Sequence, residues 1–504
     1  MGDTRGRGAF ALDVTWLAVL AGVALVVAQA LWFHHLVDDA FITFRYARNW
    51  VDGHGVVFNP GERVEGYTSF LWVVTSAAAL ALGVSPLAAA RVLGVAGAAA
   101  CVLAAFLMAR RLAPRSAWLA PLLVGLHSGL GLWAWAGMET TFFAGLVALA
   151  FALHLEGRLT RPLEGALWLA VCLTRPEGGL LLVVALVSAL AARAGGAAAR
   201  LRPLLVPLAI AGLGVLAHLV WRRAYYGAWL PNTFHAKAGA TTAQLARGVR
   251  YLGDFVLHSG GLLALLPVLA WRADWRWRTL AAGAGALALF AVLVGGDNML
   301  AHRFLVPALP LLAALAATAL GELLGSQRAR VLAVAALALL LCRVGDRDLA
   351  RDVSRWNASA RDWIQIGHWL HGHEPPGTLI ALGAVGAVPY YSRLPTIDLF
   401  GLTDAHIAAR DVASIGSGFA GHEKGDGAYV LSRQPALIFG RVQIYPMVPA
   451  EDPILGLMSE TLGEREVRDH PSFARDYRFE TARVGRGHIA LFRRVSPAPA
   501  GDGR

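Results

Sequence analysis

Long apolar runs, separated by short polar segments, fill the first two thirds of the chain. Most of these runs approach the roughly 17–25 apolar residues that a helix needs to cross the hydrocarbon core of a bilayer. The runs cover residues 14–33, 69–83, 87–108, 117–135, 139–155, 163–192, 203–221, 260–271, 279–295, 304–323 and 329–343. We therefore expect a polytopic α-helical membrane protein with about 10–12 transmembrane helices.

Two of the runs and the orientation stay open at this stage. Residues 69–83 are few enough to form a re-entrant segment, and residues 163–192 form either one long helix or two short ones broken at Arg175-Pro176. The arginines before the first run place the N-terminus in the cytoplasm by the positive-inside rule. Simple alternation of the helices then puts the arginines of residues 110–115 on the outside, so the rule does not settle the topology.

The pattern changes near residue 345. Charged residues and turns become frequent, and helical spacing appears between Ser354 and Leu370. Short apolar runs typical of strands occur at Thr378–Leu382, Ala436–Phe439 and His488–Phe492. We therefore divide the chain into a transmembrane domain, residues 1–344, and a soluble extracytoplasmic α/β domain, residues 345–504.

The composition agrees with a membrane protein. Of the 504 residues, 56% are hydrophobic and only 16% are charged, which is more apolar than soluble domains of this size. The formal net charge of +11 would favour nucleic acid as the partner of a soluble protein. Here the arginines lie in clusters between apolar runs, which favours membrane orientation and phosphate-bearing lipids instead. We expect no nucleic-acid partner.

Two polar, aromatic-rich loops interrupt the apolar pattern. The first outer loop spans residues 34–68, and the second outer loop spans residues 222–259. Ionisable groups gathered at a membrane boundary are functional candidates, because they are costly to keep there. We expect the two loops to build a site on the outer face of the membrane.

Two adjacent aspartates, Asp38 and Asp39, follow the first apolar run. As a helix, residues 37–51 carry an apolar stripe that can lie on the membrane or on neighbouring helices, with both carboxylates in the first turn. An aspartate in that position can simply cap the helix. A carboxylate at the lipid boundary can also take a proton from an acceptor hydroxyl or bind a cation. Two of them together, in front of Arg45 and Arg48, favour the functional interpretation.

The sequence around this pair resembles a known class of enzymes. The segment DDAFITFRYARNWVDGHGVVFNPGERVEGYTSFLW, residues 38–72, is similar to the terminal β-(1→2)-arabinofuranosyltransferase family of the mycobacterial cell wall and its wider bacterial relatives. These proteins are GT-C class membrane glycosyltransferases. Further segments that carry the resemblance are LTRPEG at 173–178, YYGAWLPNTFHAKAG at 225–239, GGDNMLAHRFLVPALP at 295–310 and GAVGAVPYYSRLPTIDLFGLTDAHIA at 383–408.

The resemblance implies a GT-C-like fold and a sugar donor attached to a polyprenyl phosphate, which is decaprenyl-phosphoryl arabinose in the mycobacterial relatives. It also implies inversion at the anomeric carbon. Asp38 and Asp39 match the acidic pair after the first span, where GT-C enzymes keep the catalytic carboxylate. No cofactor is implied and no metal ligand is assigned, although a divalent cation at Asp38 and Asp39 stays an alternative.

Other polar residues are candidates for binding the substrates. Because cationic side chains hold phosphates well, the expected ligands of the donor phosphate are Arg45, Arg175, Lys237 and Arg303. Residues expected to contact the sugar or the acceptor are Glu65, Tyr67, Glu139, Glu177, Asn232, His235, Asp297 and His302.

Four of these candidates also have structural interpretations. Arg175 and Glu177 flank a proline in an apolar run and can pair with each other. Lys237 can be an ordinary solvated charge of the second outer loop. Arg303 begins an apolar run, where a long cationic side chain can extend to the membrane surface.

The sequence thus predicts an inverting glycosyltransferase of the bacterial plasma membrane with an extracytoplasmic active site. It would move a sugar, arabinofuranose or a related pentose or hexose, from a polyprenyl-phosphate donor to a cell-envelope glycan or lipid. The alternatives are a polyprenyl-lipid transporter or flippase and a non-catalytic envelope-assembly protein. A transporter would place its charges near the bilayer midplane within an inverted repeat, whereas the polar residues here gather in the outer loops.

Overall fold

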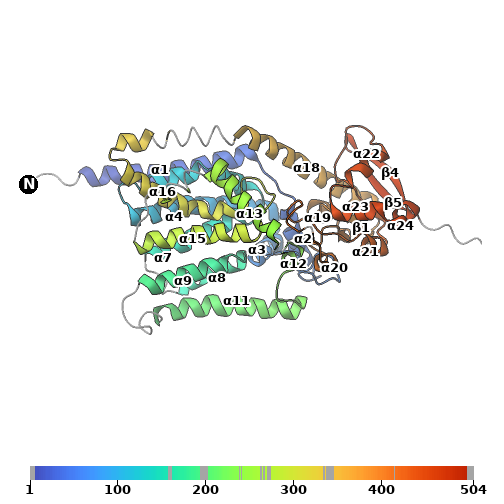
Figure 1. Cartoon of the computed structure of the whole chain (residues 1–504), viewed down its shortest axis with the longest axis horizontal. Helices are drawn as coiled ribbons and strands as arrows, with labels where there is room; N and C mark the ends of the chain where they lie inside the picture. The colour runs from blue at the N-terminus through green and yellow to red at the C-terminus, as the bar shows by residue number, and fades with distance from the viewer. Residues whose placement is uncertain are drawn as a thin grey trace, which may run out of the picture.

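A bundle of apolar helices is followed by a smaller domain built on a five-stranded sheet. Figure 1 shows the helices of the bundle running side by side, with the sheet domain beyond one end of them. The computed structural model describes residues 6–495 apart from 157–161, 193–201, 238, 240, 261–263, 265–266, 269–273, 333–334, 336–345 and 414.

The apolar helices of the bundle differ widely in length. They are α1 (Gly6–Phe33), α3 (Phe70–Ala81), α4 (Pro86–Leu112), α5 (Leu119–Gly125), α6 (Ser128–Trp135), α7 (Thr140–Leu155), α8 (Pro162–Thr174), α9 (Gly178–Ala192), α11 (Leu205–Tyr226), α15 (Trp275–Leu293) and α16 (Leu309–Leu323). Within the described residues, the segments long and apolar enough to cross a membrane are Trp16–Phe33, Pro86–Leu112, Arg202–Tyr226, Trp275–Leu293 and Arg303–Leu323. The predicted polytopic helical fold is confirmed.

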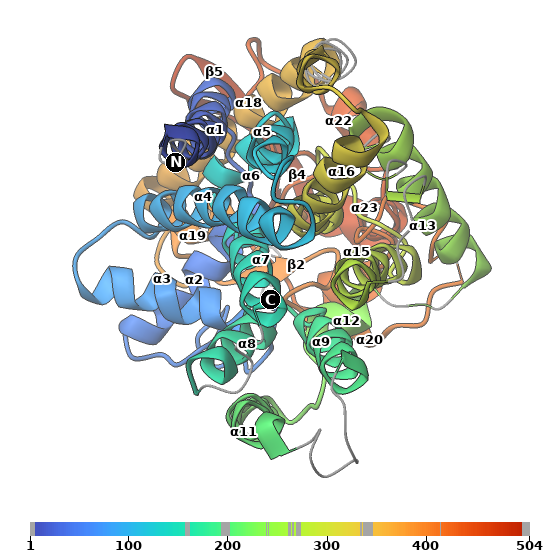
Figure 2. The same cartoon turned by 90° about the vertical axis from the view of Figure 1, so that its left-hand side faces the viewer.

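Burial separates the inner helices from the outer ones. In the segment Arg303–Leu323, 89% of the most apolar window is buried inside the protein, whereas in Arg202–Tyr226 only 17% is buried. A helix that is apolar on all sides and buried forms the core, and one whose apolar sides stay open faces lipid. Figure 2 accordingly shows α16 among other helices and α11 at the rim of the bundle.

The structure decides several of the open helix assignments. Residues 163–192 form two helices, because Pro176 interrupts the backbone hydrogen bonds between α8 and α9. The 12 residues of α3 rise about 18 Å, which is too short to cross a bilayer. Residues 117–135, expected as one span, form α5 and α6 instead. They are separated at His127, whose Nδ1 accepts the N–H of Gly129 and caps α6. The helices expected at 260–271 and 329–343 lie largely outside the described residues.

Figure 1 shows α2 (Asp39–Val51) and α12 (Asn232–Lys237) between the bundle and the sheet domain, and α13 (Thr242–Asp254) alongside the helices of the bundle. α2 belongs to the first outer loop, and α12 and α13 belong to the second. Of the two expected positions of α2, on the membrane or on neighbouring helices, the structure shows packing inside the protein, because residues 40–47 are all buried. The reason is that Phe41 and Phe44 pack against Tyr390 of the sheet domain, which covers α2 from the outside.

The sheet domain begins with the long helix α18 (Asp346–His373). Its strands are β1 (Ile380–Leu382), β2 (Thr396–Asp398), β3 (Leu437–Ile438), β4 (Tyr477–Val484) and β5 (Gly487–Arg494), and its short helices are α19 (Ala387–Ser392), α20 (Ala405–Ala409), α21 (Gly427–Ser432), α22 (Glu451–Leu457), α23 (Leu462–Asp469) and α24 (Pro471–Asp476). The strand order is β2-β1-β3-β5-β4, parallel among the first three strands and antiparallel in the rest. The three predicted strands correspond to β1, β3 and β5.

The sheet domain is attached to the end of the first helix. The side chain of Asn357 in α18 donates to the carbonyl of Phe33 at 3.0 Å, and its oxygen accepts the N–H of Leu36 at 3.0 Å. These bonds satisfy backbone groups that the end of α1 leaves free. The predicted boundary between residues 344 and 345 falls outside the described residues and stays a prediction.

Candidate active site

Asp38 joins the first outer loop to the sheet domain. Its two carboxylate oxygens accept the backbone N–H groups of Gly386 at 2.9 Å and of Ala387 at 2.7 Å, at the start of α19. A Cβ at residue 386 would collide with the carbonyl oxygen of Asp38, so this approach requires glycine. Asp38 therefore acts as a cap for a helix that lies 348 residues further along the chain.

Burial dominates the ionisation of Asp38. It raises the pKa of the carboxyl from 3.8 to about 7, while the N–H of Ala387 opposes this shift and the charge of Asp39 adds to it. Both oxygens accept N–H groups and the residue is buried, so little of this carboxylate is accessible to a substrate. The first of the two predicted catalytic aspartates is thus placed in a structural contact.

Asp39 differs from its neighbour. It is the first residue of α2 and is partly exposed, and it makes no hydrogen bond or ion pair with the part of the chain that the structure describes. Lys237 ends α12. Solvent reaches part of its side chain, but many protein atoms lie around its ammonium group. Burial lowers the pKa of Lys237, and the charge of Asp39 is the largest influence that opposes this shift. A free carboxylate and a free ammonium group therefore lie within electrostatic reach of each other.

Three ion pairs lie next to Lys237 in the helix bundle. Arg175 donates from Nε to Glu177 Oε1 at 2.5 Å and from Nη1 to Glu139 Oε1 at 2.8 Å. Arg303 donates from Nε to Asp297 Oδ2 at 3.0 Å. No more than 8% of any of these five side chains is exposed. We call Glu139, Arg175, Glu177, Asp297 and Arg303 the charged cluster.

The charged cluster is assembled at breaks between helices. Glu139 precedes α7, Arg175 and Glu177 separate α8 from α9, and Arg303 begins the 3-10 helix η3 (Arg303–Ala308). The guanidinium groups of Arg175 and Arg303 both lie over the ring of Phe304, at 5.3 and 5.0 Å from its centre. The charges of Arg175, Asp297 and Arg303 also influence the pKa of Lys237. The candidate active site is therefore Asp39, Lys237 and the charged cluster.

The structure gives Arg45 another role than the predicted one. Its guanidinium is buried and donates to the carbonyls of Phe58, Pro389 and Leu394 and to the side chain of Asn59. These bonds use four of the N–H groups of the arginine. Arg45 therefore ties α2 to the sheet domain instead of holding a phosphate, a contact that sequence spacing could not indicate.

This correction can be tested with Arg45→Met. We expect the free energy of unfolding to fall by about 3 kcal/mol, because several buried carbonyls lose their donor. The affinity for polyprenyl phosphate should stay unchanged. Thermal unfolding in detergent and equilibrium binding of the lipid measure the two quantities. A large loss of affinity without a loss of stability would restore the phosphate-binding role.

Glu65, Tyr67 and Asn232 hold the outer loops together. Glu65 pairs with Arg222 Nε at 2.6 Å, and burial raises the pKa of Glu65 to about 7, against the opposing charge of Arg222. The hydroxyl of Tyr67 lies 3.1 Å from that of Tyr226. The side chain of Asn232 donates to three carbonyls of residues 401–404. The structure thus gives all three side chains structural partners, and their contact with sugar or acceptor stays a prediction.

The two predicted histidines pack against aromatic rings. His235 is exposed on α12 with its ring against Phe234. His302 precedes η3 in a left-handed conformation, with φ of +51, and packs on Tyr251 and Phe255. Among the described residues, no group of three or more His, Cys, Asp and Glu side chains is arranged to hold a metal ion. A cation at Asp38 and Asp39 stays an untested prediction.

The sequence analysis missed His422. This histidine lies in the sheet domain, in a loop with glycines at 416, 418, 421 and 425. The charges of Asp39 and Lys237 both influence its ionisation, which places it beside the candidate active site. An isolated histidine in a loop has no motif, and only the run of flexible glycines around it could have drawn attention.

Comparisons with known proteins agree with the arrangement of the helices. The structure of ArnT from Cupriavidus metallidurans bound to undecaprenyl phosphate superposes with a TM-score of 0.55 at 15% identity, over 94% of this chain and 97% of that one. The chain has the GT-C fold. The oligosaccharyltransferase of Archaeoglobus fulgidus, solved in complex with Zn and sulfate, matches with a TM-score of 0.50 at 14% identity, over 76% of this chain and 62% of that chain.

Two sequence relatives confirm the resemblance seen in the motifs. The terminal β-(1→2)-arabinofuranosyltransferase of Mycobacterium tuberculosis is 31% identical over 265 residues, which cover 48% of this chain and 40% of that protein. The enzyme of the same name from Corynebacterium glutamicum is 30% identical over 358 residues, 59% of this chain and 50% of that protein. The chain thus spans about half the length of these relatives, or less.

A family model also matches the sheet domain. Its description is a domain of unknown function, DUF8728, and the match covers residues 351–492. These residues run from α18 through β5, so the match coincides with the sheet domain and contains His422.

Proposed function

We propose that this protein is an inverting glycosyltransferase that moves a sugar from a polyprenyl-phosphate donor to a hydroxyl of a cell-envelope glycan or lipid. It would act on the outer face of the bacterial plasma membrane, with arabinofuranose as the first sugar to examine. The observation that carries the proposal is the unengaged carboxylate of Asp39 opposite the unengaged ammonium group of Lys237. One can remove a proton, and the other can bind a phosphate.

In the proposed reaction, Asp39 acts on the acceptor hydroxyl and Lys237 acts on the phosphate that leaves. Asp39 takes the proton of the acceptor hydroxyl, and the freed oxygen attacks the anomeric carbon from the face opposite the phosphate. The bond between that carbon and the phosphate oxygen breaks, so the configuration inverts and polyprenyl phosphate leaves with added negative charge. Lys237 stabilises this charge, because its ammonium group is in place before the reaction begins.

The charged cluster would shape the site without being its main phosphate ligand. Arg175 already donates to two carboxylates, and Arg303 donates to Asp297. Their carboxylate partners neutralise most of their charge, whereas Lys237 forms no ion pair with a carboxylate among the described residues. The predicted roles of Arg175 and Arg303 thus become support for Lys237, and Glu139, Glu177 and Asp297 keep both arginines in position.

The relatives make this donor class a reasonable first choice. The similar enzymes of Mycobacterium tuberculosis and Corynebacterium glutamicum carry the name arabinofuranosyltransferase, and the ArnT structure holds undecaprenyl phosphate. Polyprenyl phosphate alone is therefore a suitable probe of the donor site, and polyprenyl-phosphoryl arabinofuranose a suitable donor.

The test is a transfer assay with purified protein in detergent and a panel of polyprenyl-phosphoryl sugars. We expect one sugar to be transferred, with an inverted anomeric configuration in the product by NMR. Retention of configuration would overturn the mechanism. Tight binding of polyprenyl phosphate without transfer or hydrolysis of any donor would favour the flippase or the assembly protein instead.

Lys237→Met tests the phosphate ligand separately from the chemistry. We expect the affinity for polyprenyl phosphate to fall about 10- to 100-fold, since a hydrogen bond to a charged group is lost. Stability should change little, because Lys237 makes no ion pair within the described chain. Isothermal binding measurements in detergent give the affinity.

The matched control is Arg223→Met, which removes an exposed cation near the end of α11 that bonds only to the carbonyl of Gly227 among the described residues. Its affinity should equal that of the wild type. An equal loss in both variants would mean that the lipid responds to net charge and not to Lys237.

A further inference from the structure

A loop of the sheet domain, residues 415–423, is fastened onto the second outer loop. Glu423 Oε1 accepts the N–H groups of Gly416 at 2.7 Å and Gly418 at 2.9 Å, and also Arg247 Nη1 at 3.0 Å. Thr241, before α13, donates its hydroxyl to the carbonyl of Ile415 at 2.7 Å. The loop therefore has a defined shape that depends on the bundle as well as on its own domain.

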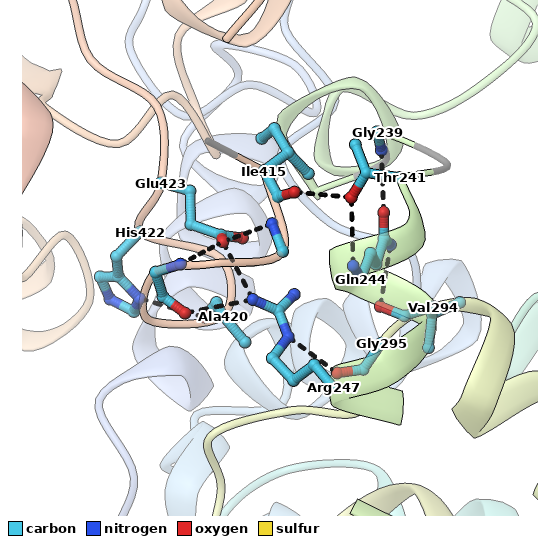
Figure 3. A network of polar contacts seen from close by, with 12 residues as sticks. Gly239, Thr241, Gln244, Arg247, Val294, Gly295, Ile415, Ala420, His422 and Glu423 are labelled. Carbon is cyan, nitrogen blue, oxygen red and sulfur yellow. Dashed lines mark hydrogen bonds and ion pairs between the residues drawn. The ribbon is translucent and has the colours of Figure 1, made fainter. Parts of the chain in front are cut away.

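Arg247 connects this loop with the segment that carries Asp297. Its Nε donates to the carbonyl of Gly295 at 3.0 Å, while its Nη1 reaches Glu423. Gln244, one turn earlier on α13, donates to the carbonyl of Val294 at 3.1 Å. Figure 3 shows Arg247 between Glu423 and Gly295, with Gln244 beside Val294. These contacts position the loop relative to the segment that leads to Asp297.

The tip of the loop lies against Lys237. At Gly421, whose φ is +82, a Cβ would come within 3.2 Å of Lys237 Cε. The next residue is His422, whose ring packs edge-on against Phe400 at 4.5 Å and next to Phe419 at 5.0 Å. These two aromatic neighbours restrict the orientation of the imidazole. The ring therefore has a defined position next to Lys237 and Asp39.

Hydrogen bonding decides which nitrogen of His422 carries the proton. Nδ1 lies 3.2 Å from the carbonyl oxygen of Ala420, and a carbonyl can only accept. Nδ1 is therefore the donor, and Nε2 of the neutral ring keeps a lone pair. Burial lowers the pKa of His422, against opposing effects of the Ala420 carbonyl and of Asp39, which favours this neutral form. Nε2 makes no hydrogen bond with the described residues.

We propose that the loop of residues 415–423 forms one wall of the candidate active site, and that His422 Nε2 accepts a hydrogen bond from a hydroxyl of the donor sugar. The inference rests on the proposed function for the identity of that sugar. Under this proposal the domain of unknown function, residues 351–492, supplies a residue that binds the sugar. A neutral acceptor suits a sugar hydroxyl, whereas a second cation beside Lys237 would compete for the phosphate.

Chemical modification tests the position of His422 without requiring turnover. Diethyl pyrocarbonate acylates neutral imidazole nitrogens, and peptide mass spectrometry measures the rate at each histidine. We expect the sugar-bearing donor to slow modification of His422 about tenfold, and polyprenyl phosphate alone to slow it less, since one hydrogen bond distinguishes them. His406, exposed in the same domain and 3.1 Å from Asp426, is the internal control and should react equally in all samples.

The donor is the sugar that the wild-type protein transfers, or the arabinofuranosyl form if none is transferred. Equal protection by the two lipids would contradict the hydrogen bond between His422 and the sugar. No protection by either lipid would also contradict the proposal that the loop lines the active site. Protection by the sugar-bearing lipid in a protein without transfer activity would support this inference while the proposed function fails.

Side-chain replacement supplies a second, independent readout. His422→Gln can place an amide oxygen near the position of Nε2, whereas His422→Asn reaches only the position of Nδ1. We expect His422→Ala and His422→Asn to raise the KM for the donor about tenfold, and His422→Gln to stay near the wild type. Identical effects of all three variants, with equal melting temperatures, would contradict the role of Nε2.

Discussion

Asp39→Asn is expected to lower the rate of sugar transfer about 10²- to 10⁴-fold, the usual contribution of a general base. The amide has the same shape as the carboxylate but cannot take the proton of the acceptor hydroxyl. The protein should remain folded, because Asp39 has no partner among the described residues. Transfer rates and melting temperatures of the purified variant provide the measurement.

Asp52→Asn is the matched control for this experiment. Asp52 lies at the opposite end of the same helix and is exposed. The same chemical change there should leave transfer unaffected. A rate within a few-fold of wild type in Asp39→Asn would remove Asp39 as the base and, with it, the proposed mechanism.

Asp38→Ala is expected to lower the free energy of unfolding by about 2–4 kcal/mol, because two buried N–H groups lose a charged acceptor. The effect should appear first as loosening of the sheet domain, since Gly386 and Ala387 belong to it. Thermal unfolding and limited proteolysis report the two events. Asp348→Ala, which removes an exposed aspartate of α18, is the control and should change little.

The ionisation of Asp38 gives this contact a pH dependence with a defined sign. The pKa of the folded protein is about 7 and the usual value is 3.8, so the folded state holds the proton more tightly. The stability contributed by Asp38 is therefore full below about pH 4 and declines as the pH rises toward 7. Asp38→Asn should flatten this decline. An unchanged decline in the variant would show that another group causes it.

The sequence predicted the local features of the site better than its long-range partners. The acidic pair was recognised and the break at Pro176 was one of two alternatives, because each is a departure from the apolar pattern within a few residues. The pattern could not tell Asp38 from Asp39, since the difference lies in N–H groups 348 residues away.

The same limit explains the other corrections. Arg45 and Asn232 are residue types that commonly bind phosphates or sugars. Here their side chains donate to backbone carbonyls of the sheet domain instead. Carbonyl groups leave no signature in a sequence, so a buried arginine that serves them looks like one that serves a ligand. His422 was missed for the opposite reason, because its place beside Asp39 depends on the folding of two separate domains.

The contact between Asp38 and α19 also bears on the order in which the protein is made. Helices near the N-terminus form first during synthesis, and the domains that follow fold later. Asp38 and Asp39 therefore leave the ribosome long before Gly386, and His422 follows later still. A growing chain with inserted helices would already carry the acidic pair, while Asp38 would still lack the N–H groups of Gly386 and Ala387. The arrangement around Asp39 and Lys237 would therefore form only after the sheet domain has been synthesised and folded.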